Sequence, residues 1–156
     1  MDTEKEYPEI HLDSLDHLWF QVAGTLCNIK CEHCFISCSP VNHSFEFMTF
    51  DQVNNYLEES VIRGVKEYYF TGGEPFMNKD MLRIIEKTME LGPATVLTNG
   101  MLITPEKADR LKIISKNSIY SLELRVSIDG YTEEMNDAIR GKGVFKKAME
   151  GVKNLV

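Results

Sequence analysis

The chain alternates strand-like and helix-like segments four times, and this alternation limits the folds open to it more than any other feature. Short apolar or β-branched runs occur at 17–24, 67–71, 94–100 and 120–130, and helical spacing or helix-start signals follow each of them or the loop after it. Parallel neighbours need long crossovers, which helices usually provide. The sequence therefore predicts an α/β fold, a parallel sheet with helices outside.

Two of the expected helices carry clear boundary signals. Thr49 and Gln52 have the spacing of a capping box, and Gly64 follows the end of that helical run. Thr104 precedes Pro105, which gives a capping residue followed by proline at the first helical position. The predicted helices cover about 49–64, 78–91, 104–116, 132–139 and 145–156.

Length, composition and charge limit the domain count, the cellular location and the partners that we expect. At 156 residues the chain is long enough for one domain with its own core. No apolar run approaches the roughly 18 to 20 residues of a membrane span, so we expect no membrane partner. The opening "MDTEKEYPEI" is acidic, unlike a secretory signal, which favours a cytoplasmic and reducing location. A net charge of −7 argues against nucleic-acid binding.

All four cysteines lie in one segment, residues 27–38. Core cysteines would be scattered, and a structural zinc site usually takes its four ligands from two separated pairs. An iron–sulfur cluster suits a single loop wrapped around it. Four thiolates would saturate a four-iron cluster and suit electron transfer, whereas three would leave one iron open. The sequence alone does not decide whether Cys38 is the fourth cluster ligand or takes no part in binding.

Polar and glycine-rich loops follow the ends of the expected strands. The fourth strand also alternates Leu122, Leu124, Val126 and Ile128 with Glu123, Arg125, Ser127 and Asp129. These four polar side chains either point into an interior that holds a ligand, or lie on the solvent-exposed face of an edge strand. The alternation alone does not decide between the two arrangements. In parallel α/β folds, ligands bind at the carboxyl edge of the sheet.

The run Cys27-x3-Cys31-x2-Cys34 resembles the signature of the radical S-adenosylmethionine (radical SAM) enzymes. The resemblance implies a partial (β/α) barrel, of which about four βα units are present. It also implies that these three cysteines bind a [4Fe-4S] cluster. The amine and carboxylate of S-adenosylmethionine would then chelate the fourth iron.

The segment "TGGEP" after the second strand resembles the second motif of the same family. There the resemblance implies that Gly72, Gly73 and Glu74 recognise the methionyl amine. Glycines let the backbone approach a ligand closely, and a carboxylate attracts an ammonium group.

Further matches extend the resemblance along the chain. "TNG" (98–100) and "SIDG" (127–130) are similar to strand-end motifs that contact the cosubstrate, through Asn99, Ser127 and Asp129. "NDAIRGKGVF" (136–145) resembles a segment of members with C-terminal auxiliary clusters, the SPASM or twitch type, and implies that Arg140 contacts the ligand. His33 stands where the family commonly has an aromatic residue that packs by the adenine.

The activity implied is reductive cleavage of S-adenosylmethionine. An external one-electron reductant, flavodoxin-like or ferredoxin-like, would supply the electron, and the 5′-deoxyadenosyl radical would take hydrogen from a peptide or small-molecule substrate. No side chain is assigned to chemistry on the substrate. The alternatives are a non-catalytic electron carrier with Cys38 as fourth ligand, and a binding or folding module without activity.

The family barrel usually has six strand–helix units, and this chain supplies four. Residues 1–156 are therefore expected to form a radical SAM core that is incomplete at its C-terminus, without an auxiliary-cluster domain.

Overall fold

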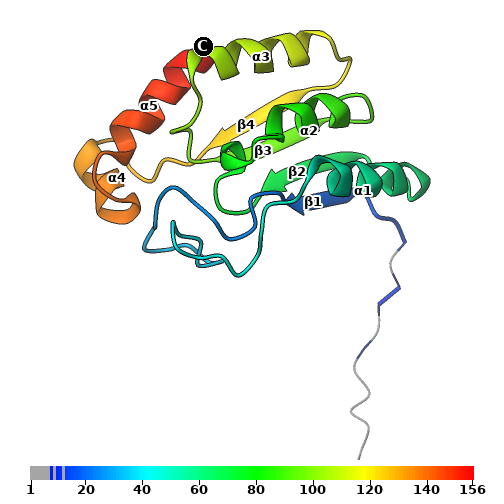
Figure 1. Ribbon diagram of the computed structural model, residues 1–156, viewed down its shortest axis with the longest axis horizontal. Coiled ribbons are helices and arrows are strands. Elements are labelled where there is room, and N and C mark those ends of the chain that lie inside the picture. Colours follow the sequence, from blue (N-terminus) through cyan, green and yellow to red (C-terminus); the bar gives the residue numbers. More distant parts are fainter. Residues whose placement is uncertain (1–7, 9, 12) are drawn as a thin grey trace, which may run out of the picture.

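A four-stranded parallel sheet forms the centre of the computed structural model (Figure 1). The structure describes residues 8, 10, 11 and 13–156. The strands lie in the order β1-β2-β3-β4, and each neighbouring pair is parallel. Their bounds are β1 His17–Gln21, β2 Glu67–Thr71, β3 Ala94–Thr98 and β4 Leu122–Val126. The predicted parallel α/β architecture is confirmed.

Helices cover one face of this sheet, and the core lies between the two layers (Figure 1). On β2, Tyr68 and Phe70 are buried, while the residues that alternate with them face the other side. Burying a large apolar side chain contributes about 1.5 to 3 kcal/mol, so this face supplies much of the stability. The helices are α1 Phe50–Ile62, α2 Met81–Thr88, α3 Pro105–Lys116, α4 Glu133–Arg140 and α5 Val144–Leu155, with a 3-10 turn η1 at Pro75–Met77.

The opposite face of the sheet carries aromatic and charged side chains. Trp19 and Tyr69 stack with ring centroids 4.4 Å apart, and the Arg125 guanidinium lies 5.8 Å from the centre of the Tyr69 ring. Arg125 also pairs with Glu123 on the same strand, and both are exposed. β4 is the last strand of the sheet, so Glu123 and Arg125 match the prediction of an edge strand with one solvent-exposed face.

Local signals place two helix starts where the sequence predicts them. The Thr49 hydroxyl accepts the Gln52 amide at 3.2 Å, and the Gln52 side chain accepts the Thr49 amide at 2.8 Å. Such a cap stabilises a helix by about 1 kcal/mol. The Thr104 hydroxyl caps α3 by accepting the Lys107 amide at 3.3 Å.

Strand β1 and helix α2 are shorter than predicted, because loop groups bond to the backbone at the end of β1 and before α2. β1 ends at Gln21, and the next carbonyl, that of Val22, accepts bonds from the Met48 amide and the Asn78 side chain. Asn78 also bonds the Met48 carbonyl and accepts the Asp80 amide, so α2 begins only at Met81. Asn78 thus joins the segment after β1 to the segment before α1, and it does not begin a helix.

Helical spacing places Phe145, Ala148, Met149, Val152 and Val156 on one face of the last helix, and only Ala148 of these is buried. Phe145, Met149 and Val152 are only partly buried, and Val156 is exposed. The buried centre is formed by Val144, Ala148 and Gly151. A side chain at Gly151 would place its Cβ 2.0 Å from the Gly100 carbonyl oxygen, so α5 packs directly on the turn after β3.

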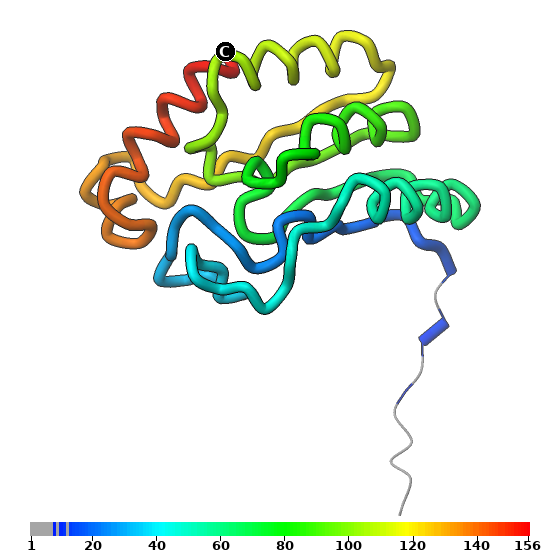
Figure 2. Tube along the Cα trace, viewed as in Figure 1, coloured from blue at the N-terminus to red at the C-terminus, as the bar shows by residue number. Residues whose placement is uncertain are grey.

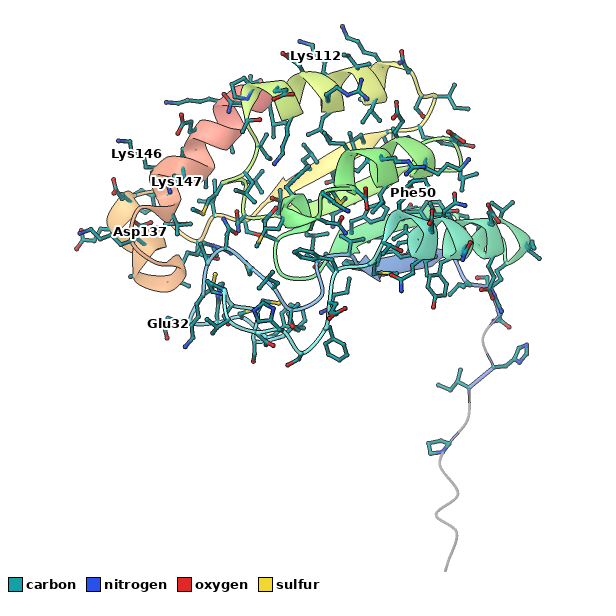
Figure 3. The ribbon with its side chains drawn as sticks, in the orientation of Figure 1. Glu32, Phe50, Lys112, Asp137, Lys146 and Lys147 are labelled. Atoms are coloured by element: carbon teal, nitrogen blue, oxygen red, sulfur yellow. The ribbon has the colours of Figure 1, made fainter. Side chains whose placement is uncertain are left out.

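The strand ends meet the cysteine loop and α4 at one end of the molecule. Figure 2 shows the blue-to-cyan segment of the cysteine loop beside the orange segment of α4, and a bond from the Glu32 amide to the Ile139 carbonyl at 2.9 Å joins them. In Figure 3 the labels Glu32 and Asp137 mark these two segments. Among the helices described, none has the length and apolar character needed to cross a membrane.

Candidate functional site

A pocket of about 280 Å³ opens at the carboxyl edge of the sheet. It is lined by the cysteine loop, the turns after β2 and β3, the residue after β4 and the end of α4. Most residues that the sequence predicts for the site line this one pocket: Cys27, Cys31, His33, Cys34, Gly72, Gly73, Asn99, Ser127 and Arg140. Glu74 and Asp129 do not line it, and their places are described below.

Backbone bonds close the cysteine loop on itself. The Cys27 amide donates to the Ser39 carbonyl at 3.2 Å, and the Ser39 amide donates to the Thr25 carbonyl at 3.3 Å. Within the loop that these two bonds close, turns at Cys31–Cys34 and Cys34–Ser37 bend the chain. Three thiols separated by three and two residues are thereby brought to the wall of one cavity.

All four thiols of the loop are free, and the surroundings of Cys27, Cys31 and Cys38 favour the protonated form. Burial raises the pKa of Cys27. Burial also raises the pKa of Cys31, an effect that the nearby Arg140 charge opposes. Burial, together with the neighbouring Cys34, raises the pKa of Cys38 to about 12. Since metals bind thiolates, a positively charged metal group must displace these protons when it enters.

The glycine turn after β2 packs directly against the start of the cysteine loop. The Gly73 amide donates to the Gly24 carbonyl at 3.0 Å, and the Glu74 amide donates to the Leu26 carbonyl at 3.2 Å. A Cβ on Gly73 would lie 1.8 Å from the Leu26 carbonyl oxygen. Gly72 has φ +124°, a conformation that favours glycine. Both glycines are therefore needed for this close backbone approach.

Glu74 points away from the pocket and is fully buried. Its carboxylate accepts the Thr98 hydroxyl at 2.7 Å, the Asn99 amide at 2.8 Å and the Phe76 amide at 3.1 Å. Burial raises the pKa of Glu74, and these three donors oppose that effect. The carboxylate thus ties the turn after β2 to the turn after β3.

Replacing Glu74 by glutamine is expected to lower the free energy of unfolding by about 1 to 3 kcal/mol, because one amide N–H would then face a donor in a buried site. Urea unfolding of the metal-free protein measures this, with Glu150→Gln on the exposed side of α5 as the control. A Glu74→Gln protein as stable as the control would show that the carboxylate has no such structural role.

Asn99 connects the turn after β3 to the first cysteine. Its side-chain amide donates to the Asn28 side-chain oxygen at 2.7 Å and lies 3.9 Å from the Cys27 sulfur. The Asn28 amide in turn contacts the Met101 sulfur at 3.9 Å. Sequence reasoning missed Asn28; its position directly after Cys27 was the available signal.

The segment after β4 separates the two polar residues predicted for it. Ser127 lines the pocket. Asp129 instead contacts Arg140 and His33 through one carboxylate oxygen, at 2.5 Å to Arg140 Nε and 3.1 Å to His33 Nε2. The fully buried Asn136, which sequence reasoning also missed, accepts the Asp129 amide at 3.0 Å.

The donor set fits an iron–sulfur group. Four cysteines, Cys27, Cys31, Cys34 and Cys38, line one cavity with soft sulfur ligands, and iron–sulfur clusters are held by thiolates. Within residues 13–156 and the described positions before them, no three His, Cys, Asp or Glu side chains converge on a single ion. The thiols face a common space instead. Backbone glycines and polar side chains at the other wall suit a polar cosubstrate.

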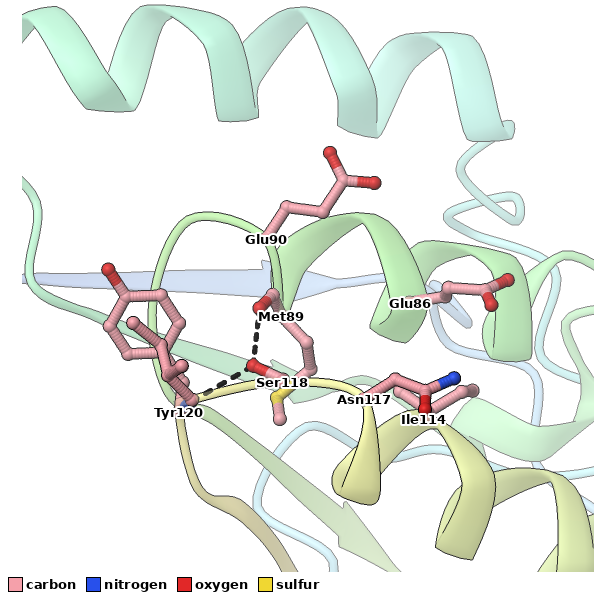
Figure 4. Close-up of a pocket in the computed structure, with 8 residues that line it drawn as sticks. Glu86, Met89, Glu90, Ile114, Asn117, Ser118 and Tyr120 are labelled. Atoms are coloured by element: carbon pink, nitrogen blue, oxygen red, sulfur yellow. Dashed lines mark hydrogen bonds between the residues drawn. The ribbon is translucent and has the colours of Figure 1, made fainter.

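A larger cavity, of about 490 Å³, lies at the opposite end of the sheet (Figure 4). It is lined by the ends of α2 and α3 and the approach to β4. Its Ser118 hydroxyl donates to the Met89 carbonyl at 2.6 Å and accepts the Tyr120 amide at 3.0 Å. The Ser118 hydroxyl therefore stabilises the local backbone. The thiol-lined pocket is the better candidate for a functional site, despite its smaller volume.

Comparison with known proteins gives a family match. The model of the Radical SAM superfamily matches residues 22–156. The chain is 34% identical over 130 residues to Fe-coproporphyrin III synthase of Methanosarcina barkeri, covering 82% of this chain and 31% of that protein. It is also 34% identical over 130 residues to mycofactocin maturase MftC of Mycobacterium tuberculosis, covering 83% of this chain and 32% of the relative. The chain thus spans about a third of the length of these relatives.

Solved structures agree on the fold. SuiB of Streptococcus suis matches with a TM-score of 0.68 and 21% identity, covering 90% of this chain and 31% of that one. SuiB bound to S-adenosylmethionine matches with a TM-score of 0.65 and 20% identity. At these identities the likeness confirms the fold.

Proposed function

Because this chain belongs to the Radical SAM superfamily, we propose that it is the core domain of an enzyme that cleaves S-adenosylmethionine reductively at a [4Fe-4S] cluster. The observation that carries the proposal is one pocket lined by all four thiols of the cysteine loop, two glycines of the turn after β2, and polar side chains from the ends of the other strands. The match covers residues 22–156, which contain every residue of the pocket.

In this proposal Cys27, Cys31 and Cys34 hold the cluster and leave one iron for the cosubstrate. When bound, the cluster would supply one electron for cleavage of the sulfonium carbon–sulfur bond of S-adenosylmethionine, which would give methionine and a 5′-deoxyadenosyl radical able to take hydrogen from a substrate.

The residues of this chain bind and orient the reactants. The turn at Gly72 and Gly73 lets the cosubstrate approach the backbone, while Asn99 and Ser127 supply polar contacts on the same side of the pocket. Glu74 acts behind this surface by holding the turns after β2 and β3 together. We therefore assign Glu74 to support of the pocket rather than to contact with the methionyl amine.

The proposed partners are S-adenosylmethionine, a one-electron reductant of the flavodoxin or ferredoxin kind, and a peptide or small-molecule substrate. The named relatives span both substrate classes, since one is a synthase of an iron porphyrin and another a maturase. Free thiols and an oxygen-sensitive cluster suit the reducing cytoplasm.

Cys38 supports a second candidate function, that of an electron carrier. It lines the same pocket, and its amide lies 3.2 Å from the Cys34 sulfur. As a fourth ligand it would saturate the cluster and leave no iron for a cosubstrate.

Anaerobic reconstitution followed by detection of 5′-deoxyadenosine separates the two functions. We expect the wild-type chain and Cys38→Ala to bind four irons each and to form 5′-deoxyadenosine and methionine in equal amounts when dithionite is present. Without dithionite, neither product should form. Loss of the cluster in Cys38→Ala, or a loaded wild-type protein that forms no 5′-deoxyadenosine, would support the carrier instead.

A further inference from the structure

A band of contacts joins the C-terminal end of α4 to the cysteine loop, more than a hundred residues earlier in the chain. The Glu32 amide donates to the Ile139 carbonyl at 2.9 Å. The next residue of α4, Arg140, places Nη1 3.9 Å from the Cys31 sulfur. A positively charged guanidinium group therefore lies beside a proposed cluster ligand.

Asp129 is the partner that balances this charge. Its carboxylate oxygen Oδ2 lies 2.5 Å from Arg140 Nε and 3.1 Å from His33 Nε2. The Arg140 Nε–H is not aligned for a hydrogen bond, so charge holds this pair. The Arg140 side chain is only 11% exposed and that of Asp129 25%, so water screens the pair less than it would at the surface.

The backbone around Asp129 is fixed as well. The fully buried Asn136 side chain accepts the Asp129 amide at 3.0 Å. A Cβ on the next residue, Gly130, would lie 2.5 Å from the Met135 Cβ, so the chain passes close to α4 here. Asp129 is thus held on the α4 side, beside Arg140 and His33.

We propose that Asp129 is a positioning residue that holds Arg140 and His33 against the cysteine loop and neutralises the guanidinium charge next to Cys31. This inference rests on the proposed function, because it concerns the charge beside the cluster. It differs from the sequence prediction, which gave Asp129 to the cosubstrate. The pair sets the electrostatic environment of the cluster before any cosubstrate arrives.

The test is the reduction potential of the reconstituted cluster, measured without S-adenosylmethionine by a spectroscopic redox titration at one fixed pH. Reduction adds negative charge, so a nearby positive charge raises the potential. We expect Asp129→Asn, which leaves Arg140 unbalanced, to shift the potential upward. Arg140→Gln should shift it downward, and the double variant should return close to the wild-type value. Glu134→Gln, the same charge change on the exposed side of α4, should leave it unchanged.

Limited proteolysis of the metal-free protein gives a second reading. In Asp129→Asn, Arg140 and His33 are no longer held against the cysteine loop, so cleavage within residues 27–38 should rise several-fold. The Glu134→Gln protein should be cut at the wild-type rate. If Asp129→Asn holds no cluster, the double variant decides: regained cluster binding supports the charge pair, and continued loss contradicts it.

Unchanged potentials in both single variants would overturn the inference. So would an Asp129→Asn protein with wild-type potential and proteolysis but weakened S-adenosylmethionine binding, since Asp129 would then be a cosubstrate ligand. These failures differ from failure of the proposed function, in which the wild-type chain itself would bind no cluster or cleave no cosubstrate.

Discussion

Replacing Cys31 by alanine is expected to leave the reconstituted protein without its iron–sulfur cluster and to abolish formation of 5′-deoxyadenosine. The thiol lines the same cavity as Cys27 and Cys34, so its loss removes one of only three proposed ligands. Outer-shell partners of a metal are worth about 10- to 100-fold in affinity, and loss of a direct ligand is expected to exceed that. Iron analysis and the absorption spectrum of the anaerobically reconstituted protein measure the effect.

The same result is expected for Cys27→Ala and Cys34→Ala. Cys38→Ala is the matched control, because it removes a thiol from the same loop and the same pocket. A Cys31→Ala protein that keeps its full iron content would remove Cys31 from the ligand set. If all four variants lost the cluster alike, the three-ligand assignment would be wrong.

Replacing Gly73 by alanine is expected to lower the free energy of unfolding by at least about 3 kcal/mol, as severe overpacking does. The new Cβ would lie 1.8 Å from the Leu26 carbonyl oxygen and 2.3 Å from its carbon. These are backbone atoms, which no side-chain rotation can move away. Relief requires the turn after β2 to separate from the start of the cysteine loop, so reconstituted iron content should fall as well.

Urea unfolding of the metal-free protein measures the stability, and iron analysis after reconstitution measures the loop. Gly64→Ala is the control: its Cβ would meet nothing within 4 Å, and only its φ of +76° opposes a side chain. We expect that strain to cost about 1 to 2 kcal/mol and to leave cluster binding intact. Equal stability and equal iron content in the two variants would show that contact between the glycine turn and the loop is not tight.

Much of the fold follows from the sequence because local and long-range signals agree. The capping box at Thr49 and the capped proline start at Thr104 set helix boundaries that the structure reproduces. The alternation of strands and helices gave the parallel sheet, and parallel strands necessarily bring their following loops to one edge. Convergence of the cysteine loop, the glycine turn and Asn99 on one pocket is a consequence of that topology.

Individual side-chain directions could not be predicted in the same way. The alternation along 120–130 places Ser127 and Asp129 on one face only while the chain remains a strand, and β4 ends at Val126. Beyond Val126 the chain is no longer a strand, and Ser127 lines the pocket while Asp129 contacts Arg140. The burial of Glu74 depends on Thr98 and Asn99, 24 and 25 residues away, which no local pattern reveals.

The most direct test of the account asks what occupies the fourth iron. Electron–nuclear double resonance on the reduced, reconstituted protein, with S-adenosylmethionine labelled at its carboxylate oxygen and amino nitrogen, reports atoms bound to the cluster. We expect hyperfine coupling from both labels in the wild-type chain and in Cys38→Ala. A fully loaded cluster with no coupling from either label would mean that protein sulfur closes the site, and the account would be contradicted.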